Sequence, residues 1–145
     1  MKPNLTLKLS IEPGRWAVCR FAPGTDCSLL QEHLFTAVWT PEETSVVCRY
    51  ESAPAAVPTQ GPFAMLKVQG PLDFSLTGIM AALTRPLADA GISIFAISTY
   101  DTDYLLVGES WLSDAVAGLR AAGFKVNEML EANTALIPND ADNAL

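Results

Sequence analysis

The stretch PLDFSLTGIMAALTRPLADAGISIFAISTYDTDYLLV (Pro71–Val107) carries the clearest structural pattern in the sequence. Its apolar residues first recur at a helical spacing, which predicts a helix over 76–90 that ends before Gly91. Two apolar runs follow, at 92–99 and 104–108, and their continuous hydrophobicity predicts strands in the interior of a sheet. The stretch therefore predicts a helix followed by a pair of strands.

The sequence on either side of this stretch extends the pattern. Residues 63–69 predict a strand before the helix, and a second helix is predicted to start near Leu112 and to end before Gly123. A short last strand follows at 124–127. The resulting order, β-α-β-β-α-β, is that of the ferredoxin-like unit, so the sequence predicts an α+β fold.

The N-terminal part repeats this order in a reduced form. It predicts short strands, with no more than single helical turns between them, at 5–10, 16–21, 34–40 and 45–50. The turn signal Glu12-Pro13-Gly14 separates the first two of these strands. A ferredoxin-like unit this small leaves one sheet face and the sheet edges uncovered, so we expect the two units to pack side by side.

The chain of 145 residues therefore divides into two small domains in this interpretation. The segment SAPAAVPTQGP (52–62) contains three prolines and one glycine without any hydrophobic period, which is typical of a linker. We expect a first domain over 1–51, the linker over 52–62, a second domain over 63–128 and a loose acidic tail over 129–145.

The net charge of −7 narrows the range of partners. It argues against nucleic acids and anionic membrane surfaces, because binding to both relies on clusters of Lys and Arg. No apolar run reaches the roughly 18 residues of a membrane span, and the N-terminus lacks the apolar core of a signal peptide, so we expect a cytoplasmic protein. The spacing of Cys19, Cys27 and Cys48 matches no zinc site, and we expect Cys19 and Cys48 to be buried as small apolar side chains.

The residues available for catalysis are few. His33 is the single histidine, so no two-histidine metal site can form, and no nucleophile or phosphate-binding motif occurs. We therefore expect no enzyme activity, no cofactor and no metal. Asp101 and Asp103 remain as a carboxylate pair for general acid–base chemistry, which is the weakest of the functions considered.

A small-molecule site is better supported. Gly78 follows Asp73 and Ser75 at the start of the long helix, where free N–H groups and the helix dipole favour a carboxylate. Asp101 and Asp103 follow the next strand, and their carboxylates favour an ammonium group. The carboxyl ends of two parallel strands lie at the same edge of a sheet, so both loops can contact one zwitterion such as an α-amino acid.

Purely structural roles compete with this interpretation. Asp73 or Ser75 would then cap the helix, and Asx hydrogen bonds of Asp101 and Asp103 would form the turn. We expect one aspartate to stabilise the turn and the other, Asp103, to contact the ligand.

The stretch Pro71–Val107 resembles the second domain of ACT-domain proteins of the CASTOR-like type, through the pattern TG(I/V), PLA-x-AGIS and IST(Y/F)-x-x-D. The N-terminal stretches WAVCRF and TAVWTPEETSVVCRY resemble the first ACT domain of the same family. The resemblance implies two tandem ferredoxin-like ACT domains, the first with degenerate helices, that bind an amino acid at their interface.

The resemblance also implies which residues bind the ligand. They are Ser45 and Val46 of the first domain, together with Gly78, Ile79, Thr99, Tyr100 and Asp103 of the second, the aspartate binding the ligand amine. Gly78 and Asp103 are the two that the loop argument reaches without the resemblance.

Two functions are therefore predicted. The first is a regulatory module that binds an amino acid or a similar small zwitterion and signals the presence of this ligand to a partner. The alternative is an interaction module that has lost ligand binding and pairs subunits through sheet edges or helix faces. The sequence leaves open a homodimer and a regulated protein partner.

Overall fold

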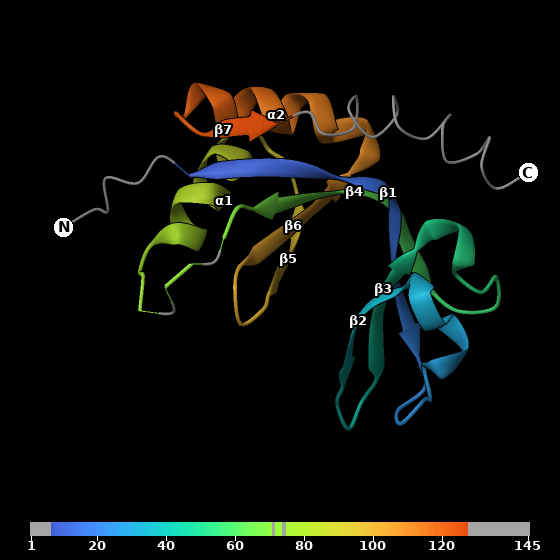
Figure 1. The fold of residues 1–145 in the computed structure, drawn as a ribbon. Helices are drawn as coiled ribbons and strands as arrows, with labels where there is room; N and C mark the ends of the chain where they lie inside the picture. Colours follow the sequence, from blue (N-terminus) through green and yellow to red (C-terminus); the bar gives the residue numbers. More distant parts are fainter. Residues whose placement is uncertain (1–6, 71, 74, 128–145) are drawn as a thin grey trace, which may run out of the picture. The chain divides into compact units, whose positions relative to one another are not determined.

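A computed structural model describes residues 7–70, 72–73 and 75–127 of the chain (Figure 1). The expected tail over 129–145 and the start of the strand expected at 5–10 lie outside these residues. The chain divides into two compact units, unit 1 comprising Met1–Pro13 and Met65–Leu145, and unit 2 comprising Gly14–Ala64.

This division differs from the predicted domains, because two strands contribute residues to both units. Strand β1 (Lys8–Phe21) continues through the expected turn at Glu12-Pro13-Gly14. Strand β4 (Thr59–Val68) begins inside the expected linker. A sequence pattern indicates where a chain is extended but not which strands it pairs with, so the assignment of the first strand to unit 1 was missed.

Unit 1 has the predicted element order, β4, α1 (Ile79–Asp89), β5 (Ile94–Ser98), β6 (Asp103–Gly108), α2 (Leu112–Ala121) and β7 (Lys125–Asn127). The mixed α+β fold is confirmed.

Its sheet contains one further strand, because the first residues of β1 lie between β7 and β4. Lys8 to Ser10 pair in parallel with β7, and the N–H of Gln69 donates to the carbonyl of Lys8 at 2.7 Å.

The core of unit 1 is built from aliphatic side chains. Helices α1 and α2 pack against each other, and α2 also contacts β6 and β7 (Figure 1). The leucines and valines that the helices and the central strands bury completely are Leu66, Val68, Leu83, Leu87, Leu105, Leu106, Val107 and Leu119. Each buried side chain of this size contributes about 1.5–3 kcal/mol, so this core accounts for much of the stability of unit 1.

Unit 2 contains strands and short 3₁₀ helices. Strand β3 (Thr44–Arg49) pairs antiparallel with β1 and with β2 (Leu34–Trp39). The helical turns expected between the N-terminal strands include η1 (Ser28–His33), and η2 (Tyr50–Ser52) follows β3. The order of elements is therefore that of unit 1 with each helix shortened to 3₁₀ turns.

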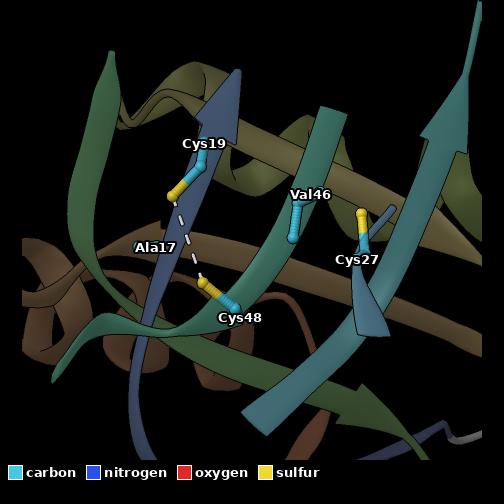
Figure 2. Packing of buried hydrophobic residues seen from close by; sticks show 5 residues of the cluster. All are labelled: Ala17, Cys19, Cys27, Val46 and Cys48. Atoms are coloured by element: carbon cyan, nitrogen blue, oxygen red, sulfur yellow. Dashed lines mark hydrogen bonds between the residues drawn. The ribbon is translucent and has the colours of Figure 1, made fainter. Parts of the chain in front are cut away.

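The core of unit 2 is unusual in its thiols. Figure 2 shows Cys19, Cys27 and Cys48 with Ala17 and Val46 in one buried cluster. All three cysteines are free, and the sulfur atoms of Cys19 and Cys48 lie 4.0 Å apart. Burial raises the pKa of the Cys48 thiol to about 12. The expectation that Cys19 and Cys48 are core residues is confirmed.

Candidate functional site

A cavity of about 310 Å³ lies in unit 1, between the segment that leads into α1 and the turn between β5 and β6. It reaches the lower end of the range found for small-molecule sites. Its walls are formed by Leu72, Asp73, Leu76, Gly78, Ile79, Met80 and all residues from Ser98 to Asp103. Of the seven predicted site residues, Gly78, Ile79, Thr99, Tyr100 and Asp103 are therefore brought together here.

The start of α1 forms one side of this cavity. Gly78 precedes the helix with a φ of +77°, a conformation that glycine adopts without strain. Among the described residues no side chain caps the helix, and no acidic residue lies in its first turn. A methyl group in place of the Gly78 hydrogen would meet no atom within 4 Å. The first N–H groups of an α-helix have no acceptor within the helix, and the helix dipole favours an anionic ligand beside them.

The alternative in which Asp73 or Ser75 caps the helix is wrong. The carboxylate of Asp73 instead accepts hydrogen bonds from the hydroxyl and the backbone N–H of Ser75, at 2.7 and 2.9 Å. These two bonds lower the pKa of Asp73. Asp73 therefore stabilises the loop before the helix as an anion.

The turn from Thr99 to Thr102 forms the opposite side of the cavity. The N–H of Thr99 donates to the carbonyl of Thr102 at 2.8 Å, and the N–H of Thr102 donates to the Thr99 hydroxyl at 3.2 Å. The buried hydroxyl of Thr102 donates to the carbonyl of Val68 at 2.6 Å, which fixes the turn to the end of β4. Threonine hydroxyls rather than Asx hydrogen bonds therefore hold this turn.

The two aspartates of the turn have different roles. Asp101 accepts the N–H of Leu72 through its backbone carbonyl at 2.7 Å, while its carboxylate accepts no hydrogen bond from the described residues. Asp103 is partly buried, and one carboxylate oxygen accepts the hydroxyl of Ser98 at 2.6 Å. The other oxygen of Asp103 has no hydrogen-bond donor within the described part of the chain. Asp103 thus offers an oriented, incompletely satisfied carboxylate at the cavity.

The close approach of the two loops depends on Gly70. A side chain there would place its first carbon 3.1 Å from the carbonyl oxygen of Asp101 and 3.2 Å from the backbone nitrogen of Leu72. Sequence reasoning missed Gly70, Thr102 and Ser98. The pairing of Ser98 with Asp103 in the β5–β6 hairpin was the one signal that could have identified Ser98.

The two remaining predicted site residues lie in β3 of unit 2. Val46 is fully buried in the thiol core, and Ser45 is partly buried and pairs with Arg20 of β1. His33 is exposed in η1, with the carboxylate of Glu32 4.0 Å away. Within residues 7–70, 72–73 and 75–127, no group of three or more His, Cys, Asp or Glu side chains could hold a metal, and no helix is long and apolar enough to span a membrane.

Unit 2 contains the same two local structures as the cavity of unit 1. The carboxylate of Asp26 accepts the N–H of Ser28 at 2.9 Å, as Asp73 does for Ser75. In the β2–β3 turn, the N–H of Thr40 donates to the carbonyl of Glu43 at 2.9 Å, and the N–H of Glu43 donates to the Thr40 hydroxyl at 3.1 Å. These bonds repeat the pattern between Thr99 and Thr102.

Comparison with known proteins supports the fold. Residues 59–121 match the ACT domain family. A crystal structure of protein Atu0741 from Agobacterium tumefaciens is 31% identical over 86% of this chain and 94% of its own, with a TM-score of 0.78. Protein VC0802 from Vibrio cholerae, described as a possible transport protein of unknown function, is 22% identical over 81% of this chain and 91% of its own, with a TM-score of 0.70.

A more distant structural likeness is to the regulatory subunit of aspartate kinase from Thermus thermophilus. It is 9% identical over 79% of this chain and 95% of its own, with a TM-score of 0.58, and thus shares the fold. No curated protein matches the sequence. The chain is an ACT-domain protein and belongs to the same family as Atu0741.

Proposed function

We propose that this protein is a regulatory module that binds an α-amino acid in the cavity of unit 1. The observation that carries the proposal is the pairing of two complementary groups across one cavity. The uncapped start of α1 at Gly78 suits a carboxylate, and the free oxygen of Asp103 suits an ammonium group. The thermophilic aspartate kinase subunit, which is named as regulatory, supports a regulatory rather than a catalytic role.

The finer parts of the proposal rest on the resemblance to CASTOR-like proteins. Unit 2 would be a second, reduced ACT domain. The assignment of Ser45 and Val46 to the ligand site rests on that resemblance alone, and Val46 is fully buried in the core of unit 2. The ligand would act by stabilising one arrangement of the protein that a partner recognises. The three buried free thiols of unit 2 support a reducing, cytoplasmic location.

A thermal-shift screen against the twenty amino acids tests the proposal. A ligand at one hundred times its dissociation constant stabilises the folded state by about 2.7 kcal/mol, which is a clear rise in melting temperature. Asp103→Asn should abolish this rise while keeping an acceptor for the Ser98 hydroxyl. Asp114→Asn, at an exposed aspartate in the first turn of α2, is the matched control and should respond as the wild type does.

An absence of any response in the wild type would contradict the proposal. In that case the alternative, an interaction module without a ligand, would be favoured. An equal response in the wild type and in Asp103→Asn would show that binding occurs elsewhere.

A further inference from the structure

A second cavity, of about 360 Å³, lies in unit 1 beside the same turn. Its walls are formed by Lys67, Gln69, Gly70, Thr99, Asp101, Thr102 and Tyr104. Thr99, Asp101 and Thr102 also line the first cavity, whereas Lys67, Gln69, Gly70 and Tyr104 line only the second. The turn between β5 and β6 is therefore a wall that the two cavities share.

The two cavities open on opposite faces of the sheet. Successive side chains of a strand point to opposite faces, and the neighbours Asp103 and Tyr104 line the first and the second cavity respectively. On β4, Lys67 lies between the fully buried Leu66 and Val68. Lys67 therefore lies on the face opposite to those two side chains.

The second cavity contains a cation that forms no ion pair with the described residues. No carboxylate among the described residues lies within ion-pair distance of the Lys67 ammonium, whose nitrogen lies 5.8 Å from the centre of the Tyr104 ring. Gln69 is fixed by the hydrogen bond from its amide nitrogen to the buried hydroxyl of Ser10, at 2.6 Å. Asp101 supplies the opposite charge at the shared wall. A cation, a carboxylate and an amide thus surround one polar cavity.

We propose that this cavity is a second binding site, which takes a small zwitterion. Its carboxylate contacts Lys67 and Gln69, and its ammonium group contacts Asp101. A simple anion fits less well, because Asp101 and the net charge of −7 oppose it.

Nuclear magnetic resonance separates the two sites, because each is lined by a glycine of its own. The amide of Gly70 reports on the second cavity and that of Gly78 on the first. The probes are the twenty L-amino acids, β-alanine and 4-aminobutyrate, each titrated into the labelled full chain. Acetate and methylammonium, which carry one charge each, are the controls.

We expect at least one zwitterion to shift Gly70 in a saturable way, and neither singly charged control to do so. Lys67→Met, which keeps an unbranched side chain but removes its charge, should weaken that response at least about tenfold, because a charged hydrogen bond is lost. Lys67→Arg should restore most of it. Asp103→Asn should remove the response of Gly78 while leaving that of Gly70.

Three results would overturn the second site. They are no movement of Gly70 with any probe, a Gly70 titration unchanged by Lys67→Met, and saturation by acetate as tight as by the zwitterions. Because Gly78 is followed in the same spectra, failure at the second site is distinguished from failure of the proposed function at the first.

Discussion

The two units contain the same kind of loop and turn, and in unit 1 these line a cavity of about 310 Å³ that we propose as a ligand site. Both have an aspartate that accepts the N–H of a serine two residues later, followed by a residue with positive φ, Gln31 in unit 2 and Gly78 in unit 1. After Gln31 only the last two residues of η1 precede β2, whereas after Gly78 the chain forms α1. The three-turn helix whose start lines the cavity is therefore reduced to two 3₁₀ residues in unit 2.

The last residue of the second strand differs as well. Trp39 pairs with Thr44 in unit 2, as Ser98 pairs with Asp103 in unit 1. The indole N–H of Trp39 donates to the carbonyl of Thr25 at 3.0 Å, so this side chain connects the hairpin to the loop before η1. Ser98 is small and leaves the corresponding space open. The same arrangement of loop and turn therefore forms a closed contact in unit 2 and a cavity in unit 1. The difference lies in the presence of α1 and in the side chain that ends the second strand, Trp39 or Ser98.

The largest expected effect concerns the two cores. Leu105→Ala in unit 1 should lower the free energy of unfolding by about 2–5 kcal/mol, because the side chain is fully buried. Val46→Ala, at the corresponding place in the β2–β3 hairpin of unit 2, removes less volume and should cost about 1.5–3 kcal/mol. Urea denaturation measures both. A larger loss for Val46→Ala would show that the smaller, thiol-rich core is the tighter one.

The fourth residue of the β5–β6 turn should contribute more to the free energy of unfolding than the fourth residue of the β2–β3 turn. Thr102→Val leaves the carbonyl of Val68 without its buried donor and should cost about 1–3 kcal/mol. Glu43, at the same position of the β2–β3 turn, contributes only backbone hydrogen bonds there, so Glu43→Ala should change stability by less than about 0.5 kcal/mol. Equal costs, measured by urea denaturation, would contradict the anchoring role of Thr102.

Exchanging the residue that distinguishes the two hairpins should close the cavity. Ser98→Trp fills the space between the turn and the start of α1, and we expect at least about a tenfold loss of amino-acid affinity by calorimetry. Ser98→Ala removes the hydrogen bond to Asp103 without filling the space and should weaken binding less. Ser113→Trp, at an exposed position of α2, controls for the added indole. Unchanged affinity in Ser98→Trp would exclude the cavity as the site.

A pH-dependent effect concerns the thiols, which occur only in unit 2. The pKa of Cys48 is raised to about 12 in the folded protein, above the ordinary cysteine value of about 8.5. The protonated thiol therefore favours folding below the ordinary pKa, and this contribution is lost as the pH rises toward 12. We expect stability to decline between about pH 8 and pH 10, and Cys48→Ala to reduce the decline. An identical decline of stability with pH in Cys48→Ala would rule out Cys48 as the cause of the decline.

The sequence predicted what depends on local pattern and missed what depends on pairing. Helix α1 follows from apolar spacing, and Gly78 and Asp103 follow from loop chemistry at one sheet edge. The pairing of Lys8–Ser10 with β7 could not be predicted, because the sequence of a short strand does not specify which other strand it pairs with. Thr102 was missed for a related reason, since its hydroxyl bonds a carbonyl thirty-four positions away in the chain.

The same inserted strand determines the order in which the protein can form during synthesis. Unit 2 is one uninterrupted segment, Gly14–Ala64, and all of its residues leave the ribosome before α1 does. Lys8–Ser10 leave first of the paired residues, yet their partners Lys125–Asn127 leave last. Pairing between strands so distant in the sequence forms slowly. Until β7 has been synthesised, the start of β1 lacks one of its two neighbouring strands. The unit that carries the cavity is therefore the later of the two to be completed in a growing chain.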